Sequence, residues 1–287
     1  MTNEPSGATP SKNARGKTIP YALGASDRER RRLMLQGGIL RAPLEAAFRA
    51  AGIGPGMRVL DIGCGVGDVA MLAAELVGSS GSVVALDRDA ASIDWAKRRV
   101  AEAGFTNLDF RAAEFDQFSD AVPFDALVGR FILLYLPDPV ATLRHLARSL
   151  RSGAVIAFME PVFTVPSSVF PTMADFEDCE KWVSEALRRS GARVDMGMRL
   201  HHTYRDAGFL NTKTMVSHLS GCGVTRQMAD FFVETIRSLL PKILEYGIAT
   251  PEEVGIDTLG DRMFAAAREA DPQWVGSPYI TAWACRP

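Results

Sequence analysis

The chain has 287 residues, which suits one large α/β domain with additions and is too short for three independent cores. Hydrophobic residues make up 47% and charged residues 23%, the balance of a folded protein with a well-filled interior. With 32 basic and 34 acidic side chains the formal net charge is −2, so no global field attracts phosphate backbones or anionic lipid. We therefore expect neither a nucleic acid nor a membrane as a partner.

Cysteine usage and the first residues indicate a reducing compartment. The four cysteines are far apart and form no C-x-x-C pair, and no His, Asp or Glu cluster has the spacing of metal ligands. Residues 1–18 lack the apolar stretch of a signal peptide and are interpreted as a flexible leader. No apolar run is long enough to cross a membrane. These features predict a cytoplasmic protein without a metal.

The first predicted helix follows a capping box. The residues 26–29 read Ser-Asp-Arg-Glu, in which the serine and glutamate side chains can satisfy each other's backbone, so a helix is expected to begin at Asp27. The basic run 28–32 is expected to form its solvated face. The glycine pair 37–38 is expected to break or bend this helix, with a second helix at about 43–51.

From residue 57 the chain alternates short apolar runs with helical stretches. Strands are expected at 58–62, 83–87, 108–112, 126–129 and 154–159, and helices at 69–77, 90–103 and 139–150. The strands are continuous apolar runs, which is typical of a sheet covered by helices on both faces. This alternation predicts an α/β fold with a doubly wound, mainly parallel sheet.

Beyond residue 160 the alternation lapses into helical stretches at 172–190 and 225–270, with strand candidates at 212–217 and 279–284. Two helical blocks inserted into one sheet are expected to roof a pocket. The expected organisation is listed from the N-terminus: flexible leader 1–18, helical lid segment 19–56, core 57–160, helical insertion 161–205, and final strands 206–287 with a substrate cap at 225–270.

The run 59–68 contains the most informative motif, because Gly63, Gly65 and Gly67 lead from a predicted strand into a predicted helix. Glycines permit positive φ and let a ligand lie against the backbone at the switch point of a doubly wound sheet. The dinucleotide pattern G-x-G-x-x-G needs glycine at position 68, but Asp68 stands there, and its carboxylate would repel a pyrophosphate. The motif therefore disfavours NAD.

Two acids bracket the predicted ligand site. Asp61 directly precedes the glycine loop, where a carboxylate suits a ligand that carries an ammonium or sulfonium charge. Asp87 ends the next strand about 20 residues past the loop, where a carboxylate can accept hydrogen bonds from both hydroxyls of a ribose. A nucleoside with a cationic group satisfies both acids.

The residues 59–67 and Asp87 resemble the corresponding motifs of class I S-adenosylmethionine-dependent methyltransferases. The resemblance extends from about Tyr21 to the C-terminus and includes the runs 124–128, 136–139, 150–153 and 282–284. It implies a Rossmann-like, seven-stranded sheet, S-adenosylmethionine as cofactor, and S-adenosylhomocysteine as product. It also implies methyl transfer to a small molecule, as in bacterial secondary metabolism.

The resemblance also implies a set of cofactor-binding residues. They are Tyr21, Gln36, Asp61, Gly63, Cys64, Gly65, Gly67, Asp87, Arg88, Ala113, Glu114 and Arg130. Where the family commonly has Gly-Asp-Ala after the third strand, this chain has Arg-Ala-Ala at 111–113. The usual carboxylate to the adenine amine is therefore missing, and Glu114 or the backbone around Ala113 is expected to replace it.

Four residues are candidates for a general base. Glu160 follows the fifth strand at the carboxyl edge of the sheet, where ligands bind, although a helix N-terminus is an alternative partner for it. His201, His202 and Tyr204 lie near the end of the first helical block, and adjacent histidines cannot share one helical face. A surface or core role stays open for each of these three. A base is optional, because a sulfonium is already an activated leaving group.

The roof suggests the class of acceptor. It contains a group of large apolar side chains, Phe163, Phe170, Met173, Phe176 and Trp182, which favours an aromatic or heterocyclic acceptor, with an indole-like molecule preferred and methylation at N, O or C. The same residues are equally compatible with plain core.

Two other functions stay open. One is a cyclisation or isomerisation on the same cofactor-binding fold without methyl transfer, which would form no S-adenosylhomocysteine. The other is methylation of a macromolecule, which the near-neutral charge and the roof disfavour. Whether the chain forms a homo-oligomer is also open.

Overall fold

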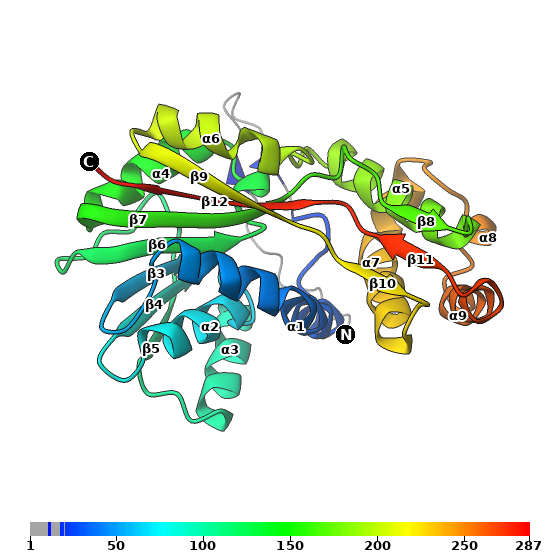
Figure 1. The fold of residues 1–287 in the computed structure, drawn as a ribbon, viewed down its shortest axis with the longest axis horizontal. Coiled ribbons are helices and arrows are strands. Elements are labelled where there is room, and N and C mark those ends of the chain that lie inside the picture. The colour runs from blue at the N-terminus through cyan, green and yellow to red at the C-terminus, as the bar shows by residue number, and fades with distance from the viewer. Residues whose placement is uncertain (1–10, 13–17, 20) are drawn as a thin grey trace, which may run out of the picture.

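A computed structural model of the protein describes residues 11–12, 18–19 and 21–287. The predicted flexible leader, 1–18, therefore lies almost entirely outside the described residues. Within it, only β1 (Ser11–Lys12) and the first residue of β2 (Thr18–Ile19) are described, and these two strands pair antiparallel. The rest of the described chain forms a large sheet with helices on both faces and a smaller helical unit at one end (Figure 1).

The large sheet has seven strands in the order β5-β4-β3-β6-β7-β12-β9. Five of them are parallel: β3 (Arg58–Ile62), β4 (Ser82–Asp87), β5 (Leu108–Ala112), β6 (Phe124–Arg130) and β7 (Leu150–Pro161). At the other end, β12 (Tyr279–Cys285) runs antiparallel to both β7 and β9 (Leu210–Ser217). Chain order reverses between β3 and β6, so the carboxyl ends of these two strands form the switch point. The predicted Rossmann-like, mainly parallel sheet is confirmed.

Helices cover both faces of this sheet, which explains the continuous apolar strands. On one face, α2 (Asp68–Val77) and α3 (Ala90–Glu102) pack on the strands, and α1 (Asp27–Ala50) packs on α2. On the other face lie α4 (Pro139–Leu146) and α6 (Met196–Ala207). Short 3₁₀ turns η1 (Leu133–Tyr135) and η2 (Ala147–Ser149) flank α4.

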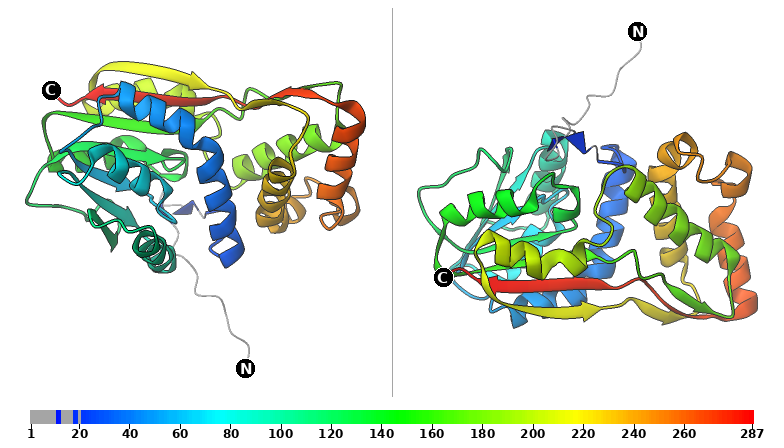
Figure 2. Two further views of the ribbon diagram at one scale, coloured as in Figure 1. Left: turned by 60° about the horizontal axis from the view of Figure 1, so that its bottom comes forward. Right: turned by 90° about the horizontal axis from the view of Figure 1, so that it is seen from above.

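The N-terminal helix is one element and not two. Ser26 caps it as predicted, because its Oγ accepts a hydrogen bond from the backbone N–H of Glu29 at 3.2 Å. Of the two expectations for the glycine pair, a break with a separate second helix is wrong, since the helix runs unbroken from Asp27 to Ala50. A bend agrees with the change of direction along this helix (Figure 2). A glycine costs a helix only about 1 kcal/mol, which packing against neighbouring helices offsets.

The smaller unit, which we call the cap, consists of helices and a three-stranded antiparallel sheet. Its elements are α5 (Ala174–Arg189), α7 (Arg226–Glu245), α8 (Pro251–Val254), α9 (Leu259–Ala270), β8 (Ser168–Phe170), β10 (Ser220–Cys222) and β11 (Gln273–Val275). The cap follows the ends of β7 and β9 and leads into β12, and α1 packs on α7 beside it (Figures 1 and 2). Residues 161–205, expected as one insertion, therefore contribute α5 to the cap and α6 to the cover of the large sheet.

Candidate active site

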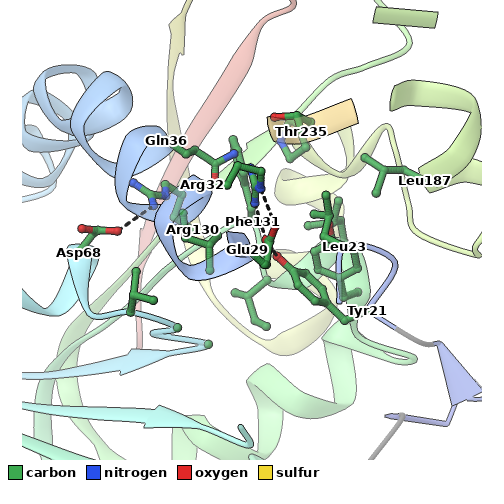
Figure 3. Close-up of a pocket in the computed structure, with 18 of the residues that line it drawn as sticks. Tyr21, Leu23, Glu29, Arg32, Gln36, Asp68, Arg130, Phe131, Leu187 and Thr235 are labelled. Carbon is green, nitrogen blue, oxygen red and sulfur yellow. Dashed lines mark hydrogen bonds and ion pairs between the residues drawn. The ribbon is translucent and has the colours of Figure 1, made fainter. Parts of the chain in front are cut away.

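A large cavity lies where the carboxyl ends of β3, β4 and β6 face the cap, with α1 between them. Asp68 and Arg130 lie at its core side, whereas Leu187 of α5 and Thr235 of α7 lie at its cap side (Figure 3). The cavity thus extends from the glycine loop to the helices that the sequence predicted as a roof.

The glycine loop forms a tight backbone turn at the end of β3. Gly63, Gly65 and Gly67 have φ values of 67°, 50° and 91°, which disfavour side chains with a Cβ. At Gly63 an added Cβ would also lie only 2.5 Å from the side chain of Ile132. The loop is thereby kept thin enough for a ligand to approach its backbone.

Asp87 fastens the end of β4 to this loop. Its Oδ2 accepts a hydrogen bond from the Gly65 N–H at 2.8 Å, and its Oδ1 accepts one from the Asp89 N–H at 2.9 Å. Burial raises the pKa of the Asp87 carboxyl, while these two hydrogen bonds oppose the rise. The carboxyl group lines the cavity beside Arg88, as expected for a group that faces a ribose.

Asp61 is a buried acid at the end of β3. It is fully enclosed, and within the described part of the chain no side chain donates a hydrogen bond to its carboxyl oxygens. Burial raises its pKa, and the charge of Arg130 and a backbone hydrogen bond from Ala70 lower it. Arg130 itself lies 3.9 Å from Asp68, which pairs more closely, at 2.9 Å, with Arg99. The glycine loop and Asp87 line the cavity and fit a nucleoside, while Asp61, enclosed at the end of β3 directly before the loop, is placed to favour a ligand that carries an ammonium group.

The first turns of α1 form a buried polar cluster beside the cavity. Arg32 donates two hydrogen bonds of 2.7 Å to the carboxylate of Glu29, and Tyr21 donates one of 3.0 Å to the same group. Only 1% of Glu29 and 2% of Arg32 is exposed. The prediction that 28–32 forms a solvated face is therefore wrong for part of the run, since Arg30 and Arg32 line the cavity and pair with acids.

Most residues predicted to bind the cofactor line this cavity. Nine of the twelve do so: Tyr21, Gln36, Gly63, Cys64, Gly65, Asp87, Arg88, Glu114 and Arg130. The other three are Asp61, described above, Gly67 and Ala113. Gly67 is the N-cap of α2, and a Cβ there would lie 3.2 Å from Ala96, so its role is in packing. Ala113 uses its backbone N–H to bond the Asp87 carbonyl at 3.0 Å.

The predicted general bases do not line the cavity. Glu160 is fully buried and accepts hydrogen bonds from the backbone N–H groups of Ile132, Leu133 and Leu134 at 3.0, 2.8 and 3.3 Å. Burial raises the pKa of Glu160 to about 8. Of its two alternatives, Glu160 therefore has the structural one, since it holds the turn after β6.

The candidate bases on α6 also lie away from the cavity, because this helix covers the face of the sheet opposite to α2. The hydroxyl of Tyr204 donates to the Ala282 carbonyl at 3.0 Å and accepts from the Phe158 N–H at 3.1 Å, so it ties β7 to β12. His201 and His202 are exposed on the surface of α6, outside the cavity. A core role for Tyr204 and a surface role for both histidines are what the structure supports.

The aromatic roof is made of other residues than predicted. Of the five large side chains proposed from the sequence, only Phe163 lines the cavity. Met173, Phe176 and Trp182 are buried in packing, and Phe170 is 80% exposed. The apolar wall comes instead from Val183 and Leu187 of α5, Phe231 and Phe232 of α7, and Trp274 of β11.

Four polar residues that line the cavity in or beside the cap were not predicted: Glu180, Thr235, Ser277 and Tyr279. In the sequence, only the position of Tyr279 at the start of the last strand could have indicated a place in the cavity. Tyr279 begins the last strand, and because β12 is antiparallel to β7, its start meets the carboxyl edge of the parallel strands. Its ring lies 5.4 Å from that of Phe131.

Within the described residues, no group of three or more His, Cys, Asp and Glu side chains is placed to hold a metal ion. None of the described helices combines the length and apolar character needed to cross a membrane.

The comparisons with known proteins agree with this site. A family model described as a methyltransferase domain matches residues 53–208, more than half of the 287-residue chain. Aklanonic acid methyltransferase DauC from Streptomyces sp. (strain C5) is 34% identical over 180 residues, which cover 58% of this chain and 80% of that protein. Ubiquinone/menaquinone biosynthesis C-methyltransferase UbiE from Cellvibrio japonicus is 28% identical over 201 residues, or 63% of this chain and 78% of that protein.

A solved protein of Bacillus halodurans shares the fold. It is 16% identical, with 85% of this chain and 98% of that chain matched at a TM-score of 0.57. The family match and the seven-stranded sheet together establish S-adenosylmethionine as the cofactor. The chain therefore belongs to the class I S-adenosylmethionine-dependent methyltransferases.

Proposed function

We propose that the protein methylates a small molecule with a flat aromatic or heterocyclic ring system. One observation carries this proposal: the cavity that begins at the glycine loop continues into an apolar, aromatic-lined end formed by α5, α7 and β11. Phe231, Phe232 and Trp274 suit flat rings, with which aromatic side chains stack or pack edge to face. An indole is one such ring system, and the names of the relatives, which mention aklanonic acid, ubiquinone and menaquinone, point to others.

The cofactor would be held at the core end of the cavity. Gly63 and Gly65 would offer backbone, Asp87 would accept hydrogen bonds from a ribose, and Glu114 would lie toward the base. The buried carboxyl of Asp61 suits the ammonium group, with no phosphate to repel. When bound, S-adenosylmethionine supplies a methyl group on a positively charged sulfur that leaves as a neutral thioether.

The contribution of the protein is then mainly alignment and exclusion of water. Holding two reactants in line can contribute about 7–11 kcal/mol by removing translational and rotational freedom in advance. The buried cluster of Tyr21, Glu29 and Arg32 lies over the same cavity and is placed to keep solvent out. None of the side chains predicted as a base reaches the cavity, so alignment has the larger part in this proposal.

The first test is calorimetric titration with S-adenosylmethionine, S-adenosylhomocysteine and NAD. We expect micromolar binding of the first two and none of NAD. Asp87→Ala should weaken the binding of S-adenosylhomocysteine by about 10- to 100-fold, because hydrogen bonds to a charged group contribute roughly 1.5–3 kcal/mol. Asp94→Ala, an exposed acid of α3, is the matched control and should leave affinity unchanged.

The second part of the test is product formation. With aromatic acceptors present, the protein should form S-adenosylhomocysteine in proportion to methylated product. Turnover of an acceptor without S-adenosylhomocysteine would instead support the cyclisation or isomerisation alternative. Equal affinity of wild type and Asp87→Ala would remove Asp87 from the cofactor site.

A further inference from the structure

The acceptor end of the cavity contains an acid that the reaction so far leaves without a role. Glu180 lies on α5, one turn before Val183 and two turns before Leu187, and all three line the cavity. Among the described cavity-lining residues, Glu180 is the only acid that the cap contributes. Burial raises the pKa of its carboxyl group, whereas the hydroxyls of Ser167 and Ser277 lower it. Burying a carboxyl group in an apolar pocket costs free energy unless hydrogen-bond partners compensate for the lost hydration.

The carboxyl group of Glu180 is held in place by a short chain of hydrogen bonds. The Ser277 hydroxyl donates to its Oε2 at 3.1 Å, and the Ser277 N–H donates to the Ser167 hydroxyl oxygen at 2.8 Å. Ser277 is only 3% exposed, so this arrangement is fixed by the protein and not by solvent. A carboxylate has about four acceptor positions, so capacity remains on the side that faces the cavity.

The position of Tyr279 connects this acid with the core end of the cavity. Burial raises the pKa of the Tyr279 hydroxyl, the charge of Glu180 raises it further, and the charge of Arg130 lowers it. Tyr279 lines the same cavity as Glu180 and Arg130, and its ring lies 5.4 Å from that of Phe131, the residue after Arg130. An acceptor bound at Glu180 would therefore occupy the same cavity as the glycine loop.

We propose that Glu180, positioned by Ser277, binds the methyl acceptor through a hydrogen-bond donor on its ring system, an aromatic O–H or a ring N–H. The apolar wall of Phe231, Phe232 and Leu187 holds the ring, and Glu180 selects molecules that place a donor at this end. A site with a buried acceptor rejects analogues that lack the donor, because its carboxylate would then stay unpaired. This inference rests on the proposed function and names the acceptor class for the same site.

The test uses pairs of probes that differ in one donor. Protein saturated with S-adenosylhomocysteine is titrated with 1-naphthol and 1-methoxynaphthalene, and then with indole and 1-methylindole. In at least one pair, we expect wild type to bind the probe that carries the O–H or N–H donor at least tenfold more tightly than the methylated probe. The pair that shows this preference distinguishes an O–H from an N–H acceptor. The absence of a preference in both pairs, including failure to bind the donors, overturns the proposal.

Variants then assign the preference to Glu180. Glu180→Gln keeps the size of the side chain and should reduce the preference to threefold or less. Glu177→Gln, an exposed position of the same helix, is the matched control and should retain it. Should Glu180→Gln fail to fold, Ser277→Ala serves instead and should reduce the preference at least threefold. An undiminished preference in a folded Glu180→Gln protein overturns the assignment.

Affinity for S-adenosylhomocysteine separates this inference from the proposed function. Wild type that binds neither S-adenosylmethionine nor S-adenosylhomocysteine contradicts the proposed function itself. Wild type that binds S-adenosylhomocysteine but shows no preference between the probes contradicts only the role of Glu180.

Discussion

At the scale of single residues, Glu160 shows how a buried acid can serve structure at the edge of an active site. Its carboxyl group accepts hydrogen bonds from the backbone N–H groups of Ile132, Leu133 and Leu134, at the start of the 3₁₀ turn after β6. Ile132 in turn packs against Gly63, so the acid supports the glycine loop from behind. Removing it would leave three backbone donors unsatisfied, at a cost of roughly 1–3 kcal/mol each.

Glu160 should also make the stability of the protein depend on pH. Burial raises its pKa from 4.5 to about 8, so between these values the folded chain retains a proton that the unfolded chain releases. The contribution of this proton to the free energy of unfolding is complete below pH 4.5 and is lost as the pH rises to about 8. Relative to Glu160→Gln, which does not titrate, wild type should lose up to about 1.4 kcal/mol of unfolding free energy per pH unit.

Urea denaturation at pH 5, 6.5 and 8 measures this difference. Glu177→Gln removes an exposed acid but retains Glu160, so as the control it should show the pH dependence of wild type. A stability difference between wild type and Glu160→Gln that is constant over this range would mean that Glu160 is ionised in the folded protein.

Whether a site residue could be predicted depends on how far along the chain its structural partners lie. The glycine loop, Asp61 and Asp87 could be located from sequence because a short run of chain fixes their geometry. Glu160 could be placed at the carboxyl edge, but its partners lie 26 to 28 residues away and were not visible. Glu180 is likewise brought to Ser277 across 97 residues by the cap, which no local pattern describes.

At the scale of elements, α1 is shaped by its contact with α2. Gly37 is buried where the two helices meet, and an added Cβ would lie only 2.4 Å from the carboxyl carbon of Asp68. Gly38, the next residue, is exposed, and a Cβ there would meet nothing within 4 Å. The first glycine is therefore required by packing, and the second is not.

The two glycines should respond oppositely to the same substitution. Gly37→Ala should displace Asp68 from Arg99 and Arg130, destabilise the fold by about 1–3 kcal/mol and lower S-adenosylhomocysteine affinity. Gly38→Ala should leave affinity unchanged and stabilise the helix by up to about 1 kcal/mol, because alanine is the better helix former. Thermal unfolding and calorimetry measure both effects. The same response from both variants would contradict a specific contact at Gly37.

Elements were predictable where one strand or helix makes its own pattern. The predicted ranges 58–62 and 108–112 coincide with β3 and β5. β3 is almost wholly buried, whereas β5 stands at one end of the strand order and buries only Phe110. The continuity of α1 was missed, because the contacts with α2 and α7 that hold it together are tertiary. For the same reason the sequence did not separate α6, which covers the large sheet, from the cap helix α5.

At the scale of the whole molecule, the cavity depends on three parts that meet around it. The core supplies the glycine loop, the cap supplies the apolar wall, and α1 packs on α2 of the core and on α7 of the cap. Tyr21 precedes α1 and joins it to the core side: its hydroxyl bonds Glu29, and its ring lies edge-on to Tyr135 at 5.0 Å. The short segment from Tyr21 to Ala25 therefore contributes to closing the cavity.

Removal of this segment should weaken the closed site. A chain that begins at Ser26 lacks the hydroxyl that satisfies Glu29 and the ring that covers Tyr135, whereas a chain that begins at Tyr21 keeps both. Because one hydrogen bond to a charged group contributes roughly 1.5–3 kcal/mol, we expect the shorter chain to bind S-adenosylhomocysteine about tenfold more weakly than the longer one. Tyr21→Phe in the full chain keeps the ring and separates its contribution from that of the hydroxyl. Equal affinity and equal turnover of the two truncated chains would show that the cavity closes without Tyr21, and the buried pair of Glu29 and Arg32 would then be sufficient to cover it.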